Sequence, residues 1–201
     1  MNYLSHLFFS TRTPLSMTGN LMGDFKPPSE LIDSLPNEIL LGIQNHRFVD
    51  KETDRFVGVK KLRTLFSASR RRFSGVITDL AFDYYLLKHW DHFAQVELDE
   101  FIELSYQNLG QSKDYMPDRM QSVVTSLIEQ DWIRTYSSLD GLSYAINRVS
   151  ERIRFKNSMH GAITEVENNY QQIESVFFEL FEHLINEVKK ANIENQNNLN
   201  Q

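Results

Sequence analysis

Apolar residues recur at spacings of three and four along most of the chain, which is the pattern of helices that bury one face. The clearest case is the segment 160–191. Its apolar stripe consists of Ile163, Val166, Tyr170, Ile173, Phe177, Leu180, Phe181, Leu184 and Val188. No run alternates apolar and polar residues between hairpin turns, so a sheet has little support. The pattern predicts an all-α protein.

Prolines mark several of the expected helix boundaries, and all five lie within the first 117 residues. We expect helices over about 2–10, 16–24, 36–56, 57–67, 74–90, 97–109, 116–131, 138–152 and 160–191. The residues 192–201 are rich in Asn and Gln and have little to bury, so they are predicted to be a disordered tail. With no internal repeat and no linker, residues 1–191 are predicted to form a single helical domain.

Composition excludes several classes of protein. The chain has 201 residues and no cysteine, which excludes a thiol nucleophile, a zinc–thiolate site and an iron–sulfur cluster. It carries 21 basic and 27 acidic residues, a formal charge of −6, which argues against broad binding to nucleic acid. We find no targeting segment and no apolar run long enough to span a membrane, so the expected compartment is the cytoplasm.

Polar residues on the apolar helices suggest a metal site. His46 and Asp50 are spaced i, i+4, and so are Asp79 and Asp83. Two further candidates lie upstream, namely His6 and Asp24. Neutral imidazole together with carboxylates is a ligand set for Mn²⁺, Mg²⁺, Fe²⁺ or Zn²⁺. Spacing alone leaves two interpretations open: a divalent-metal site, or solvated helix faces with surface ion pairs.

Two basic groups stand out in this acidic chain. Arg70, Arg71 and Arg72 are consecutive, and the second group is Arg148, Arg152 and Arg154. The run Arg70–Arg72 is either a solvated helix start or a binding site, and because basic residues at a helix N-terminus oppose the helix dipole, the second interpretation gains support. Together these groups would suit an acidic partner or a phosphate.

Four segments in order carry a resemblance to a known family: MNYLSHLFFS, GNLMGDF, GIQNHRFVDKETD and DLAFDYYLLKHW. Over about residues 1–190 the chain resembles the acyl carrier protein phosphodiesterases, also called acyl carrier protein hydrolases. That family is described as an unconventional, all-helical relative of the HD metal-dependent phosphohydrolases. In an HD motif the histidine is followed directly by aspartate, whereas here Arg47 follows His46 and the acidic residue comes at Asp50.

The resemblance implies an enzyme that uses Mn²⁺, or another divalent ion such as Mg²⁺ or Fe²⁺, to remove 4′-phosphopantetheine from holo-acyl carrier protein. The implied metal ligands are Asp24, His46, Asp50 and Asp79. His6 or Asp83 would complete the ligand set or orient a water molecule, and Arg47 would meet the phosphate. The two arginine groups would dock the acidic carrier protein.

Two other classes of function remain open at this stage. One is a helical metal-dependent hydrolase that acts on a nucleotide or another phosphoester. The other is a non-catalytic helical binding protein, whose aspartates form only surface ion pairs. Metal content and phosphate release from a panel of substrates would separate these classes.

Overall fold

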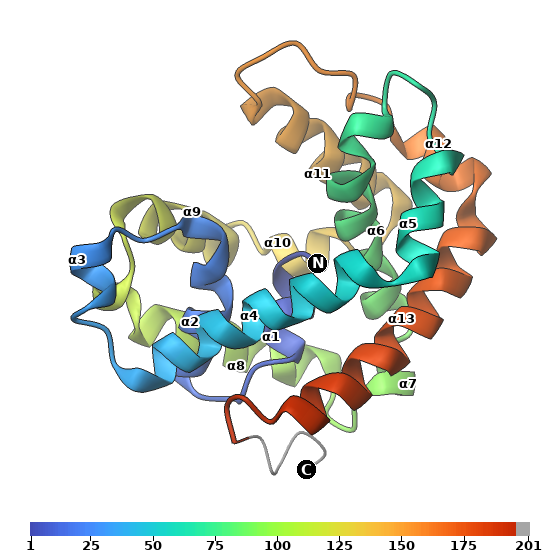
Figure 1. The fold of residues 1–201 in the computed structure, drawn as a ribbon. Coiled ribbons are helices and arrows are strands. Elements are labelled where there is room, and N and C mark those ends of the chain that lie inside the picture. The colour runs from blue at the N-terminus through green and yellow to red at the C-terminus, as the bar shows by residue number, and fades with distance from the viewer. Residues whose placement is uncertain (196–201) are drawn as a thin grey trace.

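The computed structural model describes residues 1–195 and is helical throughout, with no strand in that range (Figure 1). The N-terminal elements are α1 (Tyr3–Phe8), α2 (Pro14–Met22), η1 (Gly23–Phe25), α3 (Ser29–Ile32), α4 (Asn37–Arg55), α5 (Val57–Leu62), η2 (Arg63–Leu65) and η3 (Arg71–Phe73). They are followed by α6 (Ser74–Lys88), α7 (Trp90–Phe93), α8 (Leu98–Gln111), η4 (Lys113–Tyr115), α9 (Asp118–Glu129), α10 (Trp132–Thr135), α11 (Leu139–Arg152), α12 (Ile163–Asn168) and α13 (Tyr170–Ala191). The all-α prediction is confirmed.

The apolar stripe at the C-terminal end runs over two helices, so the prediction of one helix over 160–191 is wrong in detail. Asn169 separates α12 from α13, with φ −115° and ψ 21°. Its side-chain amide donates a hydrogen bond of 2.7 Å to the carbonyl oxygen of Glu165. An asparagine that bonds the carbonyl four residues back competes with the helical backbone bond, which accounts for the break.

Helices α2 and α4 cross with their backbones in contact. A Cβ at Gly19 would lie 2.3 Å from the carbonyl oxygen of Ile39, and one at Gly42 would lie 2.8 Å from that of Ser16. Only glycine permits so close an approach of two helix backbones. The crossing places Asn20, which follows Gly19, against His46, which lies one turn after Gly42.

A network of polar side chains stabilises the crossing of α2 and α4. The Asn45 amide donates hydrogen bonds to the Phe9 carbonyl oxygen at 2.8 Å and to Asn20 Oδ1 at 3.0 Å. The Asn20 amide in turn donates to Glu194 Oε1 at 3.1 Å, and the Ser16 hydroxyl donates to the same oxygen at 2.6 Å. Glu194 falls within the predicted tail 192–201, so the chain is held in place beyond residue 191. Residues 196–201 lie outside the described part of the chain.

Asp83 anchors α1 from the neighbouring helix α6. Its carboxylate is fully buried and accepts hydrogen bonds from the backbone amides of Leu4 (2.9 Å) and Ser5 (3.0 Å). The Ser5 hydroxyl at 2.6 Å and the Asn2 amide at 3.0 Å complete the set. Burial raises the pKa of Asp83 to about 6, against the lowering effect of the bonds from Ser5 and Leu4. Since six residues are too few for a stable isolated helix, this contact fixes α1 and the direction of its side chains.

Aromatic side chains form the core between α1, α7 and α13. Phe181 packs against Phe8 of α1 and Phe9 just after it, with ring centroids 5.0 and 4.9 Å apart, and against Phe93 of α7 at 4.8 Å. Phe177 joins the same cluster at 5.2 Å from Phe181. The apolar stripe of α13 is therefore core. Within residues 1–195, no helix is both long and apolar enough to cross a membrane.

Replacing Asp83 by alanine is expected to lower the free energy of unfolding by at least about 2 kcal/mol, because buried donors at the start of α1 lose their acceptor. Asp83→Asn should cost less, since it retains one acceptor oxygen. Urea unfolding followed by far-ultraviolet circular dichroism measures both. The control is Asp91→Ala, an exposed aspartate on α7, with an expected change within about 0.5 kcal/mol. Equal stability of Asp83→Ala and wild type would contradict the anchoring role.

Candidate metal centre

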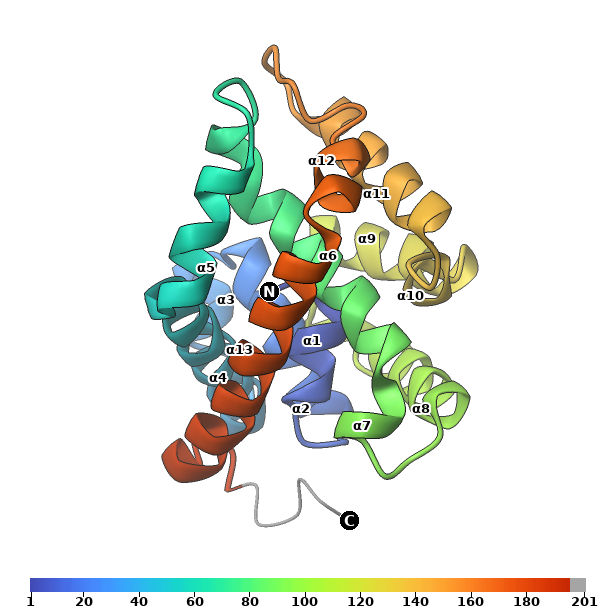
Figure 2. The same cartoon turned by 90° about the vertical axis from the view of Figure 1, so that its right-hand side faces the viewer.

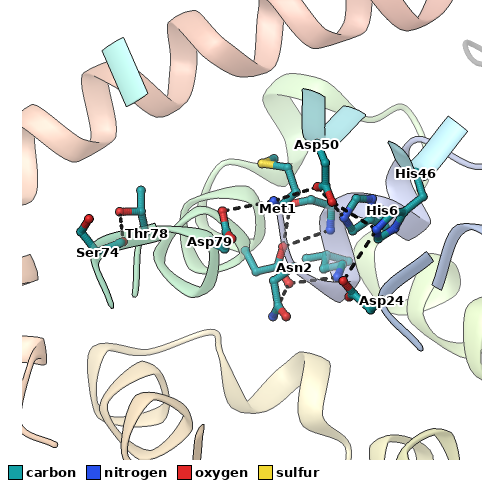
Figure 3. Close-up of polar contacts among 12 residues, drawn as sticks. Met1, Asn2, His6, Asp24, His46, Asp50, Ser74, Thr78 and Asp79 are labelled. Carbon is teal, nitrogen blue, oxygen red and sulfur yellow. Dashed lines mark hydrogen bonds and ion pairs between the residues drawn. The ribbon is translucent and has the colours of Figure 1, made fainter. Parts of the chain in front are cut away.

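Helices α1 and α4 bring three potential ligands together (Figure 3). One ligand atom from each of His6, His46 and Asp50 lies within 4.8 Å of the others. Asp50 Oδ1 is 3.2 Å from His6 Nε2, and Asp50 Oδ2 is 3.1 Å from His46 Nε2. The two imidazole rings are stacked, with centroids 3.8 Å apart and an interplanar angle of 21°. Two nitrogens and a carboxylate thus converge, as in sites for divalent cations.

Two features of α2 and η1 fix the orientation of His46. Its Nδ1 lies 2.7 Å from the carbonyl oxygen of Asn20, so Nδ1 carries the proton and donates it. That tautomer leaves the Nε2 lone pair directed toward Asp50 and toward Asp24, whose Oδ1 is 3.6 Å away. The ring lies over Gly23, where a Cβ would be 2.1 Å from the imidazole Cδ2. A histidine whose second nitrogen donates to a carbonyl is the usual arrangement of a metal ligand.

His6 is fully buried, and neither of its ring nitrogens has a well-formed hydrogen bond. The 3.2 Å separation between Nε2 and Asp50 Oδ1 has the length of a hydrogen bond but lacks its geometry. Burial lowers the pKa of His6 to about 3, with the carboxylate of Asp50 opposing that shift. A neutral buried imidazole without a partner is costly unless something binds it. A divalent cation at this point would give His6 a partner and would lie between the Nε2 lone pair of His46 and the carboxylate of Asp50.

The α-amino group of Met1 connects Asp50 to Asp79. Its nitrogen lies 3.3 Å from Asp50 Oδ1 and 3.1 Å from Asp79 Oδ1 (Figure 3). The pKa of this amine is raised to about 11, because the two carboxylates outweigh the lowering effect of burial. Burial raises the pKa of Asp79, and its attraction to the Met1 ammonium opposes that shift. Sequence reasoning could not identify the amine, since a backbone terminus carries no residue signal.

The predicted site residues therefore lie at different depths. His6, His46 and Asp50 converge on one point, Asp24 approaches His46 at 3.6 Å, and Asp79 is connected to Asp50 through the Met1 amine. The hydrogen bonds that Asp83 accepts within residues 1–195 all come from residues 2–5, which suits a part in positioning α1. Arg47 is exposed on α4 and has no ion pair or hydrogen bond within residues 1–195. Its contact with phosphate stays a prediction.

The two predicted arginine groups meet at one end of the molecule, where the loops after α5 and α11 lie side by side (Figures 1 and 2). Arg70 is engaged inside this junction: its guanidinium donates to the Ser158 and His160 carbonyl oxygens and pairs with Glu165 at 3.1 Å. Arg72 is exposed and lies 5.0 Å over the ring of Phe155. Arg70 thus joins the two loops.

The remaining members of the basic groups reach solvent. Arg71 and Arg154 are exposed. Arg148 pairs with Glu151 of its own helix at 3.1 Å, and Arg152 lies 4.8 Å over the ring of Trp132. Arg71, Arg72 and Arg154, which lie in or beside the joined loops, form a positively charged surface that we call the arginine surface. Arg148 and Arg152 instead line a pocket beside Trp132. The docking role predicted for both arginine groups stays a prediction.

Sequence reasoning missed the supports of the site. Asn20 and Gly23 lie in the segment GNLMGDF, but only Asp24 of that segment was a candidate. The available signal was Gly23 directly before Asp24, because a glycine often marks a position where another group packs closely against the backbone. Nothing in the local pattern indicated that the carbonyl oxygen of Asn20 would orient His46.

Gly23→Ala is expected to weaken Mn²⁺ binding by about tenfold or more, because the added methyl group displaces the His46 ring without removing a ligand. Isothermal titration calorimetry of purified protein with Mn²⁺ measures the affinity. The matched control is Gly75→Ala, where a Cβ meets nothing within 4 Å. Wild-type affinity in Gly23→Ala would remove His46 from the metal site.

Comparison with known proteins identifies the family. Residues 1–184 match the family described as acyl carrier protein phosphodiesterase. A protein of that name from Pectobacterium atrosepticum is 31% identical over 186 residues, covering 92% of this chain and 96% of its own. A protein of the same name from Yersinia pestis is 29% identical, and the match covers 96% of this chain and 100% of that protein. Another from Klebsiella pneumoniae is 27% identical, with 92% of this chain and 96% of that protein covered.

No solved structure matches the chain, so the likeness to HD phosphohydrolases stays a prediction. The family match covers all the helices that carry His6, Asp24, His46, Asp50 and Asp79, and it continues almost to the end of α13. The chain is thus an enzyme that belongs to the acyl carrier protein phosphodiesterase family.

Proposed function

We propose that this protein hydrolyses the phosphodiester bond between 4′-phosphopantetheine and a serine of holo-acyl carrier protein. The products are apo-acyl carrier protein and 4′-phosphopantetheine. The single observation that carries the proposal is the convergence of His6, His46 and Asp50 in a chain of this family. Neither imidazole Nε2 has a satisfactory partner without a cation.

The donor set supports Mn²⁺ as the metal. Two imidazole nitrogens and the carboxylates of Asp50 and Asp24 form a mixed set, which suits Mn²⁺ or Fe²⁺ better than Mg²⁺, an ion that prefers oxygen. When bound, such an ion supplies the charge that neutralises phosphoryl oxygens and lowers the pKa of a water molecule.

The residues of the chain supply orientation and charge. Asn20 keeps the Nε2 lone pair of His46 available, and Gly23 lets its ring lie flat against η1. Asp83 fixes the helix that carries His6. Arg47, exposed one residue after His46, is proposed to bind a non-bridging oxygen of the phosphate. Together these contacts prepare the site before substrate arrives, so little reorganisation is needed during the reaction.

The arginine surface is proposed to dock the carrier protein. Acyl carrier proteins are acidic, and this chain has a net charge of −6, so association requires a local region of positive potential. Arg71, Arg72 and Arg154 are exposed, and each lies in or beside the joined loops. Arg70, whose guanidinium joins those loops, would support this surface without contacting the partner.

The direct test of the function is mass spectrometry of holo-acyl carrier protein incubated with the protein and Mn²⁺. We expect the carrier to lose the mass of phosphopantetheine and not of pantetheine alone, which identifies the bond to serine as the one cleaved. A panel of nucleotides should release no phosphate. An intact carrier together with phosphate release from a nucleotide would favour the alternative phosphohydrolase.

His46→Ala and Asp50→Ala are each expected to lower turnover by more than about 100-fold, because each removes a ligand atom from the cluster. Asp54→Ala is the control, since Asp54 continues the same i, i+4 row but is exposed. Turnover and Mn²⁺ affinity should fall together in the first two variants, while helical circular dichroism is retained. Normal turnover in either would exclude that residue from the site.

Arg71→Glu/Arg72→Glu is expected to raise KM for holo-acyl carrier protein by about tenfold and to leave kcat nearly unchanged, because only docking is weakened. Lys189→Glu/Lys190→Glu makes the same change in charge at the far end of α13 and should have little effect (Figure 1). Steady-state kinetics at two salt concentrations measures both, since salt should also raise the wild-type KM. A KM that responds neither to the charge reversal nor to salt would contradict docking here.

A further inference from the structure

A pocket of about 150 Å³ lies between the start of α1, α6, α10 and α11. Asn2 and Tyr3 form one wall, and Trp132 and Tyr136 form another. The third wall is the face of α11 that carries Arg152 together with Tyr144 and Arg148. The pocket is separate from the ligand atoms of the metal centre, and none of the roles proposed above uses it.

Residues at the start of α1 connect this pocket to the metal centre. Asn2 lines the pocket and donates a hydrogen bond to Asp83, the anchor of the helix that carries His6. Met1, which precedes Asn2, places its amine 3.3 Å from Asp50 Oδ1. The wall formed by Asn2 and Tyr3 therefore directly follows a residue that contacts the metal centre.

The walls combine three kinds of chemistry. Trp132, Tyr136 and Tyr144 supply aromatic surface, and Asn2 supplies an amide. The guanidinium of Arg152 is held 4.8 Å over the Trp132 ring, an arrangement that leaves its N–H groups directed outward as donors. Such a pocket suits a slender ligand with methyl-bearing segments, a hydroxyl and amide carbonyls.

We propose that this pocket binds the pantetheine portion of the substrate's arm while the phosphodiester lies at the metal centre. The assignment rests on the proposed function. Pantetheine has geminal methyl groups for the aromatic walls, and two amide carbonyls that accept from Arg152 and Asn2. A volume of about 150 Å³ admits a segment of such a chain and excludes the folded body of a carrier protein. The arm is thus recognised separately from the arginine surface that docks the carrier.

Tryptophan fluorescence gives a readout that does not depend on hydrolysis. The chain has two tryptophans, and Trp90 is only 2% exposed in the core, whereas Trp132 lines the pocket. Free pantetheine, which has no phosphodiester bond to cleave, is titrated into the full-length protein. We expect a saturable change in emission, and expect Trp132→Phe to abolish it.

Variants of the pocket then separate the arm from the body of the carrier. Tyr144→Ala and Arg152→Gln should raise KM for holo-carrier and weaken pantetheine binding, each by about tenfold, while the affinity for apo-carrier, which lacks the arm, stays unchanged. Tyr144 is 57% exposed, so its removal should not unfold the chain. The control is Tyr115→Ala, a tyrosine 39% exposed on η4 outside the pocket.

The outcomes distinguish this proposal from the proposed function. Hydrolysis of holo-carrier by the wild type without any binding of pantetheine would overturn the pocket assignment alone. Equal loss of affinity for apo- and holo-carrier in Tyr144→Ala and Arg152→Gln would also overturn it, since these residues would then bind the carrier's body. Absence of hydrolysis by the wild type would instead overturn the proposed function.

Discussion

The contact between the backbones of α2 and α4 is the constraint on which the site depends. Because Gly19 and Gly42 have no side chains, a carbonyl oxygen of α2 comes within hydrogen-bonding distance of His46 on α4. A larger residue at either glycine would separate the helices, and His46 would lose the acceptor that sets its tautomer. Gly23 extends the same principle to η1, where the imidazole occupies the space of a missing methyl group. The geometry of the site therefore depends on three glycines, Gly19, Gly23 and Gly42, although none of them has a side chain that could bind a metal ion.

The centre shows how buried charge can be maintained in a small protein. The Met1 ammonium, 3.3 Å from Asp50 Oδ1, helps to hold the pKa of that carboxyl below its usual range, even though burial alone would raise it. Asp83 is instead satisfied by donors at the start of α1. The two aspartates therefore have different partners: Asp83 is compensated mainly by donors of the α1 backbone, which fixes a helix, and Asp50 by the ammonium of Met1, which leaves its carboxylate able to bind a metal ion.

Much of the fold could be predicted from the sequence, because apolar periodicity reports burial directly. Candidate ligands were also accessible, since the i, i+4 spacing places His46 and Asp50 on one helix face. The same spacing grouped Asp79 with Asp83, although one faces the Met1 amine and the other is enclosed by α1. Periodicity says that two side chains share a face but not which neighbour each will meet. The contact between Arg72 and Phe155 depends on tertiary packing, which periodicity does not report. The break at Asn169 depends on a local side-chain hydrogen bond to the carbonyl oxygen of Glu165.

The packing of Phe181 against Phe8 and Phe9 has a consequence for biosynthesis. Chains emerge from the ribosome N-terminus first, and domains fold as units. Helix α1, which carries His6, is made first, but the aromatic surface that covers it belongs to α13 and emerges last. The imidazole of His6 therefore reaches its enclosed position only when synthesis is almost complete. Until then the nascent chain already contains His6, His46 and Asp50, but α1 lacks the packing partner on α13 that holds it in place, so assembly of the site is completed only at the end of translation.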